Sequence, residues 1–300
     1  MLKNLFLSLI TVCVSITAQA RDTISVIWPF GVGDTAAQYS RSVIEVLNQT
    51  QSQYSFIFEN KPGAGSSIAA NYVARTPGTL LSASTAFFVR PNFYPTESHS
   101  VSQFVPIITQ CGAPMLIVSG KFRSWKEVPK DKPVTIAISG IGTTTNLVAT
   151  EIQKQFPELL MVPYKGIQEA TANLISGDID LQVSFVGEVQ DFLQLKRLYA
   201  LGVTGPDVID GIPTLASQGF VGMDRVVNMH SILAPANWPK ETVNDLQLMF
   251  MKASQDPRVL KSYRTDRCKP STLDSAGNQK WFVNQQSLWK ELSDRAKVHR

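Results

Sequence analysis

The sequence contains few of the residues from which catalytic and metal sites are usually built. It has three histidines and three cysteines, and His99, His230 and His299 show no metal-ligand spacing with one another or with a cysteine. No G-x-S-x-G, H-E-x-x-H or Walker sequence occurs, and the aspartates and glutamates do not cluster near the glycine-rich segments. We therefore expect no metal, no cofactor and no enzymatic activity. The enzymatic alternative is an exported hydrolase whose serine, histidine and aspartate come together only on folding.

The chain also lacks a strong charge imbalance and, after its first twenty residues, a long apolar run. Its 28 basic and 24 acidic residues give a formal net charge of +4 and form no basic run, which argues against a nucleic-acid partner. No later apolar stretch approaches the ~20 residues that are needed to span a bilayer.

Residues 1–20 have the pattern of a secretory signal peptide. Lys3 supplies a basic start, residues 5–16 are largely apolar, and Ala18-Gln19-Ala20 is a small-x-small cleavage sequence. Cleavage after Ala20 would leave a net charge of +3 and a chain long enough for two domains. We expect an exported monomer.

Two cysteines remain after this cleavage, Cys111 and Cys268. In an oxidising compartment an isolated pair can form a disulfide, and the alternative is two buried thiols. The sequence does not show whether their Cα atoms lie close enough for a bridge, so both alternatives stay open.

Strand-like runs alternate with amphipathic helical patterns along almost the whole chain. The segment Ala36–Leu47, for example, places Tyr39, Val43, Val46 and Leu47 on one helical face. Such alternation predicts α/β domains with mostly parallel sheets.

Two extended apolar segments, residues 114–125 and 229–239, are predicted to cross between the domains. The first lobe would then be discontinuous. The predicted lobes are residues 21–121 with 230–300, and residues 122–229, joined by a hinge of two strands.

Glycine-and-hydroxyl loops follow strand-like runs and precede helical patterns at several places. A helix that begins after such a loop presents unpaired N–H groups, and its dipole favours a bound anion. We therefore predict a cleft that binds a small anion. The candidate ligand-binding residues in these loops are Phe30, Gly31, Val32, Gly33, Thr35, Gly63, Ala64, Gly65, Ser66, Ser139, Gly142, Thr143, Thr144, Tyr164 and Lys165.

The first loop, residues 31–36, has other interpretations. It matches the dinucleotide pattern G-x-G-x-x-A, although an exported protein has no obvious supply of NAD, and its glycines could simply form a tight turn. On the preferred interpretation, Thr35 adds a hydroxyl to an anion site. Asp34 would repel an anion there unless it points outward or caps the helix. Ser66 in the second loop could likewise be only a helix cap.

Further candidates follow other strand-like runs. Ser84 and Thr85 should face the same cleft, and Ser184 and Phe185 should close it from the other lobe. Arg90 is either a bidentate partner of a ligand carboxylate or a solvated surface charge. Tyr164 either contacts the carbon chain of the ligand or belongs to the core, and Lys165 lies at the edge of the cleft or in a surface ion pair.

Taken in order, the motifs of this chain resemble those of the substrate-binding proteins of tripartite tricarboxylate transporters, the Bug receptor family. The motifs are Pro29-Phe30 with its glycine loop, Glu59–Gly65, Ser139–Thr143, Val162–Gly166, Gly177–Asp180, Gly211–Thr214 and Leu233–Ala236. The resemblance implies a type II periplasmic binding protein, a Venus flytrap with two α/β lobes. It also implies an extracytoplasmic receptor that hands a small carboxylate to membrane transporter subunits. A sensory ligand-binding protein without a transporter is the second alternative.

The chain departs from the family pattern at several positions. The usual glycine pair is Gly33-Asp34 here, and Ala36-Ala37 stands where the family has Thr-Asp. Asn146 replaces a frequent histidine, and Arg90 replaces a frequent asparagine. The identity of the ligand therefore stays open.

Overall fold

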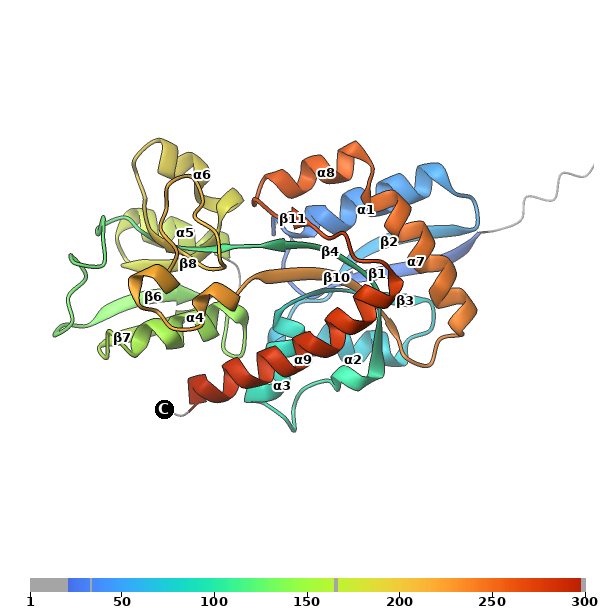
Figure 1. The fold of residues 1–300 in the computed structure, drawn as a ribbon, viewed down its shortest axis with the longest axis horizontal. Helices are drawn as coiled ribbons and strands as arrows, with labels where there is room; N and C mark the ends of the chain where they lie inside the picture. Colours follow the sequence, from blue (N-terminus) through green and yellow to red (C-terminus); the bar gives the residue numbers. More distant parts are fainter. Residues whose placement is uncertain (1–20, 33, 165–166, 298–300) are drawn as a thin grey trace, which may run out of the picture.

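The computed structural model describes residues 21–32, 34–164 and 167–297. The predicted signal peptide and the site candidates Gly33 and Lys165 lie outside the described residues. The chain forms two α/β lobes, each built around one sheet (Figure 1), as the sequence pattern predicted.

The first lobe contains a six-stranded sheet in the order β11-β4-β10-β3-β1-β2. Strands β1, β2 and β3 are parallel, and β10 runs antiparallel between β3 and β4. The strands are β1 (Asp22–Trp28), β2 (Tyr54–Asn60), β3 (Thr79–Ser84), β4 (Phe104–Ala113), β10 (Asn228–Pro235) and β11 (Lys269–Pro270).

Helices cover both faces of this sheet. Helices α1, α7 and α8 gather on one side, and α2, α3 and α9 on the other (Figure 1). Their bounds are α1 (Ala37–Thr50), α2 (Ser67–Arg75), α3 (Ala86–Phe93), α7 (Lys240–Ser254), α8 (Pro257–Arg264) and α9 (Ser275–Lys297), with short 3₁₀ turns at η1 (Ala64–Ser66) and η2 (Val101–Gln103). The predicted apolar face of α1 is confirmed, because Tyr39, Val43, Val46 and Leu47 are all buried.

The second lobe contains a five-stranded sheet in the order β7-β6-β8-β5-β9. Strand β6 is parallel to β7 and β8, whereas β5 is antiparallel to β8 and β9. Its elements are β5 (Met115–Ser119), β6 (Val134–Ile138), α4 (Thr144–Gln153), β7 (Leu159–Pro163), α5 (Ile167–Ser176), β8 (Leu181–Phe185), α6 (Val186–Gln194), β9 (Tyr199–Val203), η3 (Ala216–Gln218) and η4 (Met223–Arg225).

The chain leaves the first sheet at Pro114, which separates β4 from β5, and returns at the start of β10. Figure 1 shows β4 and β10 side by side where they run between the lobes. Strand β5, which lies before the predicted lobe limit at residue 121, pairs with strands of the second sheet. The lobe limits of residues 21–121 with 230–300, and 122–229, stay a prediction. We propose that the crossings lie at Pro114 and just before Asn228.

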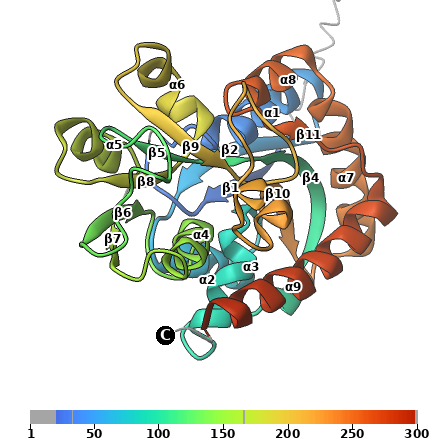
Figure 2. The same ribbon diagram turned by 60° about the vertical axis from the view of Figure 1, so that its left-hand side comes forward.

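Two features tie distant segments together. Cys111 of β4 forms a disulfide with Cys268, with their Cα atoms 5.5 Å apart. The C-terminal helix α9 packs on α3 and reaches α4 of the second lobe (Figure 2). One continuous apolar cluster includes Phe87, Leu147 and Trp289, so the packed core extends from one lobe into the other. No helix in the described part of the chain has the length and apolar character that a membrane span requires.

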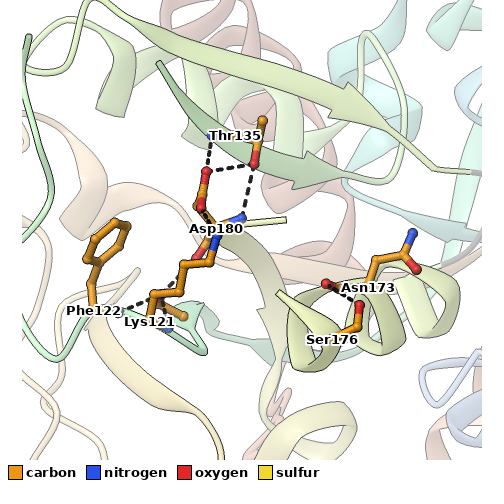
Figure 3. Close-up of polar contacts among 7 residues, drawn as sticks. Lys121, Phe122, Thr135, Asn173, Ser176 and Asp180 are labelled. Carbon is orange, nitrogen blue, oxygen red and sulfur yellow. Dashed lines mark hydrogen bonds and ion pairs between the residues drawn. The ribbon is translucent and has the colours of Figure 1, made fainter. Parts of the chain in front are cut away.

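The segment Gly177–Asp180, one of the motifs behind the family resemblance, holds the second sheet together. Asp180 accepts hydrogen bonds of 2.9 Å from the N–H and the hydroxyl of Thr135, and it pairs with Lys121 at 2.6 Å (Figure 3). Burial raises the pKa of Asp180, but the contacts with Lys121 and Thr135 outweigh it and lower the pKa overall. This motif therefore joins β8 to β6 and lies outside the cleft.

Candidate functional site

A cavity of about 90 Å³ lies between the lobes. It is much smaller than the ~300–1,000 Å³ pockets of drug-sized ligands, so its size fits a small molecule. Side chains from both lobes and from the hinge line it, and these are Trp28, Phe30, Gly31, Val32, Asp34, Ala36, Ser84, Ala86, Met115, Ser139, Thr143, Thr144, Thr145, Gln168, Phe185, Glu188, Asn228 and His230.

Many of the residues predicted from the sequence meet at this cavity. They come from the loop after β1, the end of β3, the start of α4 and the end of β8, and they are Phe30, Gly31, Val32, Ser84, Ser139, Thr143, Thr144 and Phe185. Strand ends meet here because parallel strands present their carboxyl ends at one edge of a sheet. Their contact with a ligand stays a prediction.

Other predicted residues lie elsewhere. The loop with Gly63, Ala64, Gly65 and Ser66 packs against α3, and Ser66 makes no side-chain cap. Thr85 holds the start of β10, because its hydroxyl accepts a 2.7 Å bond from Met229 N. Neither the loop nor Thr85 lines the cavity.

Four more candidates are also engaged within the protein. The Tyr164 hydroxyl accepts from Asn173 at 2.9 Å and the ring packs on the second-lobe core, as in the core interpretation. The Ser184 hydroxyl donates to Glu188 at 2.9 Å. Thr35 lies next to Asp266, and Gly142 packs against Arg90.

Arg90 occupies neither of the two positions predicted for it. Its Nη1 donates to Ile141 O of the second lobe at 2.8 Å, and its guanidinium carbon lies 3.6 Å from the centre of the Tyr94 ring. Gly187 makes a second bond between the lobes, because its N–H donates to Asp266 Oδ1 at 2.7 Å. These contacts hold the lobes against each other around the cavity.

The start of α4 supplies hydrogen-bond donors to the cavity. Thr143 is the N-cap, and its hydroxyl accepts from Asn146 N at 3.3 Å. The next two residues, Thr144 and Thr145, carry N–H groups for which the first helical turn provides no carbonyl. The Thr145 hydroxyl lies 2.9 Å from the hydroxyls of both Ser139 and Thr143, so the three hydroxyls form a cluster.

The other departures from the family pattern have structural roles around this loop. Asn146 is fully buried, and its Oδ1 accepts from Gly142 N at 3.0 Å, which fixes the loop that precedes α4. Ala37 is buried in the first-lobe core. Asp34 faces the cavity and also accepts from Ala36 N at 3.0 Å, so it caps the turn as well.

Three carboxyl groups converge at the cavity, and the sequence-based prediction that acidic residues stay away from the glycine loops is wrong. Asp34 and Glu188 line the cavity, and Asp266 lies behind them with bonds from the Tyr39 hydroxyl and Gly187 N. The sequence pointed to Asp34 but not to Glu188 and Asp266, because the three residues are far apart in the chain.

Burial raises the pKa of all three carboxyls, and the charges of neighbouring carboxylates add to this for Asp34 and Glu188. Burial, followed by the charge of Asp266, raises the pKa of Asp34 to about 6, although the Ala36 N–H opposes this. Burial and the charge of Asp34 raise the pKa of Glu188 to about 8. Burial also raises the pKa of Asp266.

His230 of β10 is the other titratable side chain of the cavity, and the sequence did not single it out as a ligand contact. It is 2% exposed, and burial lowers its pKa to about 3, so its ring is neutral. Its Nε2 lies 3.0 Å from Asn228 Nδ2 and must accept, which leaves the hydrogen on Nδ1. Nδ1 has no partner among the described residues.

The arrangement does not form a metal or nucleophile centre within the described residues. No group of three His, Cys, Asp or Glu side chains there could hold a metal ion. Ser67 and His99 lie 3.1 Å apart, but His99 Nε2 bonds to Phe87 O and neither residue lines the cavity. The geometry instead provides an enclosed set of hydrogen-bonding groups, which is typical of a binding site.

Comparisons with known proteins point the same way. The family model described as "Tripartite tricarboxylate transporter family receptor" matches residues 39–297. The chain is similar to a UPF0065 protein from the tcbD-tcbE intergenic region of Pseudomonas sp. strain P51, with 27% identity over 79% of this chain and 75% of that protein. Protein BugT of Bordetella pertussis is 21% identical over 82% of this chain and 81% of BugT.

Solved structures share the fold. The periplasmic binding protein BugD matches with a TM-score of 0.84 and 25% identity, covering 93% of this chain and 99% of BugD. Rpa4515 of R. palustris, solved with adipate, matches with a TM-score of 0.81 and 21% identity over 92% and 97% of the two chains. With a family match over most of its length, the chain belongs to the tripartite tricarboxylate transporter receptor family, whose members are periplasmic solute receptors and not enzymes.

Proposed function

We propose that this protein is an extracytoplasmic receptor that binds a small organic acid in the cavity between its lobes and delivers it to a tripartite tricarboxylate-type membrane transporter. The observation that carries the proposal is the cavity lined by both lobes in a chain of this receptor family. A ligand that contacts both lobes favours the closed arrangement, which is the basis of hinge closure.

A ligand carboxylate is best placed at the start of α4. The N–H groups of Thr144 and Thr145 and the positive end of the helix dipole favour a negative charge there. The His230 Nδ1–H and the Ser139 and Ser84 hydroxyls line the same cavity and can donate to carboxylate oxygens. In the first lobe, no atom lies near the place where a Cβ of Gly31 would be, so a ligand can approach the backbone there.

The delivery step, the export of the chain through residues 1–20 and the monomeric state belong to the same proposal. Family membership supports the delivery step, and the leader pattern of residues 1–20 supports export. At 21% identity the adipate-bound relative supports the fold alone, so the proposal depends on family membership and on the cavity.

A thermal-shift screen of mono-, di- and tricarboxylates and acidic amino acids tests the proposal. Saturation at 100 times the Kd stabilises a protein by ~2.7 kcal/mol, which for two domains of this size corresponds to a rise of several degrees in Tm. A response to none of these compounds, with a response to sugars or peptides instead, would refute the assignment.

A matched pair of variants then tests the site. Ser84→Ala removes a hydroxyl that lines the cavity and that the proposal places within reach of a carboxylate oxygen. Thr150→Ala removes a buried hydroxyl of α4 that donates to Asn146 O outside the cavity. The first variant should weaken binding about tenfold, because a hydrogen bond to a charged group contributes ~1.5–3 kcal/mol. Equal affinities of the two variants would place the ligand elsewhere.

A further inference from the structure

The charge of the cavity is unexpected for a site that binds a simple carboxylate. Of the described residues that line it, none is a lysine or an arginine, and two, Asp34 and Glu188, are acids. A third acid, Asp266, stands directly behind them. A purely anionic ligand would gain no ion pair here and would be repelled by every carboxylate that ionises.

The acids also offer acceptor atoms that the protein leaves unused. Glu188 uses Oε2 to accept from Ser184 Oγ at 2.9 Å and from Phe185 N at 3.2 Å, which caps the start of α6. Its Oε1 is buried and has no hydrogen-bond partner in the described part of the chain. A buried polar atom without a partner is costly, so a ligand that brings a donor to Oε1 of the ionised carboxylate would relieve this cost.

The same cavity presents an unused donor. His230 is 2% exposed and lines the cavity, and its Nδ1 has no partner among the described residues. Together with the first N–H groups of α4, it can serve an anionic group. The cavity therefore combines donors for a carboxylate with acceptors for a group that carries several hydrogens.

We infer that the ligand is a small amino-carboxylate, whose carboxylate lies at the start of α4 and whose ammonium group lies against Asp34 and Glu188. The inference rests on the proposed function and names the ligand class for that site. An ammonium group has three donors and a positive charge, which match the free Glu188 oxygen and the two acids. The cavity volume of about 90 Å³ limits the ligand to a few carbon atoms.

Binding of such a ligand should release a proton. Burial and the charge of Asp34 raise the pKa of Glu188 to about 8, so Glu188 is largely protonated at pH 7. A nearby ammonium favours the ionised form, and the proton leaves. The other titratable groups at this place are Asp34, Asp266, the Tyr39 hydroxyl on Asp266, and His230, whose pKa of about 3 keeps it neutral throughout.

The test is calorimetry with three matched pairs: L-alanine and propionate, L-aspartate and succinate, and L-glutamate and glutarate. In the pair that binds best, the amino member should bind at least tenfold more tightly. Titrations at pH 7 in phosphate and in Tris, whose ionisation enthalpies differ, should show that this member releases a proton and the plain acid does not.

Glu188→Gln should lower the affinity ratio within the pair at least tenfold and abolish the proton release. Asp34→Asn provides a second variant if Glu188→Gln fails to fold, and it should also lower the ratio. Glu291→Gln is the control, because Glu291 is an exposed partner of Arg225 outside the cavity.

The outcomes separate this inference from the receptor assignment. Equal or tighter binding of the plain acids would overturn the amino-carboxylate and leave the carboxylate receptor standing. If the affinity ratio within the pair is unchanged in both variants, the ammonium group does not lie against Asp34 and Glu188. If no carboxylate of any kind binds, the receptor assignment fails and this inference fails with it.

Discussion

Replacing Gly187 with alanine tests whether ligand binding requires the close approach of the lobes seen at the start of α6. The N–H of Gly187 in the second lobe donates to Asp266 Oδ1 in the first lobe at 2.7 Å. A Cβ at this position would lie 2.6 Å from Asp266 Oδ1 and 2.7 Å from Thr265 Cγ2. Asp266 is fully buried and also holds the Tyr39 hydroxyl, so it cannot turn away without losing another bond.

The magnitude follows from the contact that is lost. A hydrogen bond to a carboxyl group contributes ~1–3 kcal/mol, and the closed arrangement loses this amount if the lobes must separate at Gly187. Because only the closed arrangement places both lobes on the ligand, the Kd should rise roughly 5- to 140-fold. The open protein has no such clash. There, alanine in place of glycine in a helix should stabilise α6 by ~0.5–1 kcal/mol.

The expected signature is therefore weaker binding without a loss of stability. Calorimetry with the best ligand of the thermal-shift screen measures the Kd, and thermal unfolding without ligand measures the stability. Small-angle scattering with saturating ligand should show a larger radius of gyration than for the wild type. Gln190→Ala, a change on the same helix outside the cavity, is the control. If Gly187→Ala binds within twofold of the wild type, the Gly187–Asp266 contact plays no part in the bound state.

Two further predictions concern stability. Replacing Cys111 and Cys268 with alanine should lower the free energy of unfolding by ~2–5 kcal/mol, because the disulfide closes a long loop between residues 157 positions apart. Urea unfolding measures this difference. A reductant should have the same effect on the wild type and none on the variant. Without ligand, stability should fall as the pH rises from about 6.5 to about 8, because the folded protein keeps a proton on Glu188, whose pKa is about 8, whereas the unfolded chain has already lost it. His99 and His230 are neutral in the folded protein, where their pKa values are about 4 and about 3, but in the unfolded chain they still bind protons near pH 6.5. They therefore raise the stability over the same range by about 0.4 kcal/mol each, which offsets only part of the fall caused by Glu188. Glu188→Gln should remove the fall, and a wild-type stability that does not decrease between these two pH values would contradict the raised pKa.

Local patterns predicted much of the fold correctly. The face of α1 with Tyr39, Val43 and Leu47 is buried as expected. Such patterns are visible in a sequence because helical periodicity depends only on neighbours a few residues apart. The glycine-and-hydroxyl loops were found for the same reason, and Ser139 and Thr143 do line the cavity.

Contacts between distant segments could not be read in this way. Arg90 was expected at a ligand or in solvent, yet it bonds Ile141 O in the other lobe. Thr85 follows β3 just as Ser84 does, but its hydroxyl holds Met229 N of β10. In each case the outcome depends on which segment packs opposite, and that partner is more than 50 positions away.

By itself, the sequence determined the α/β class, the family and the loops that open the helices, because each depends on short patterns and their order along the chain. Only the tertiary structure decided the charge of the cavity. Asp34, Glu188 and Asp266 lie on three separate segments, and packing buries them together. Their raised pKa values arise first from that burial and, for Asp34 and Glu188, also from the charges of the neighbouring carboxylates, which no local stretch of sequence contains.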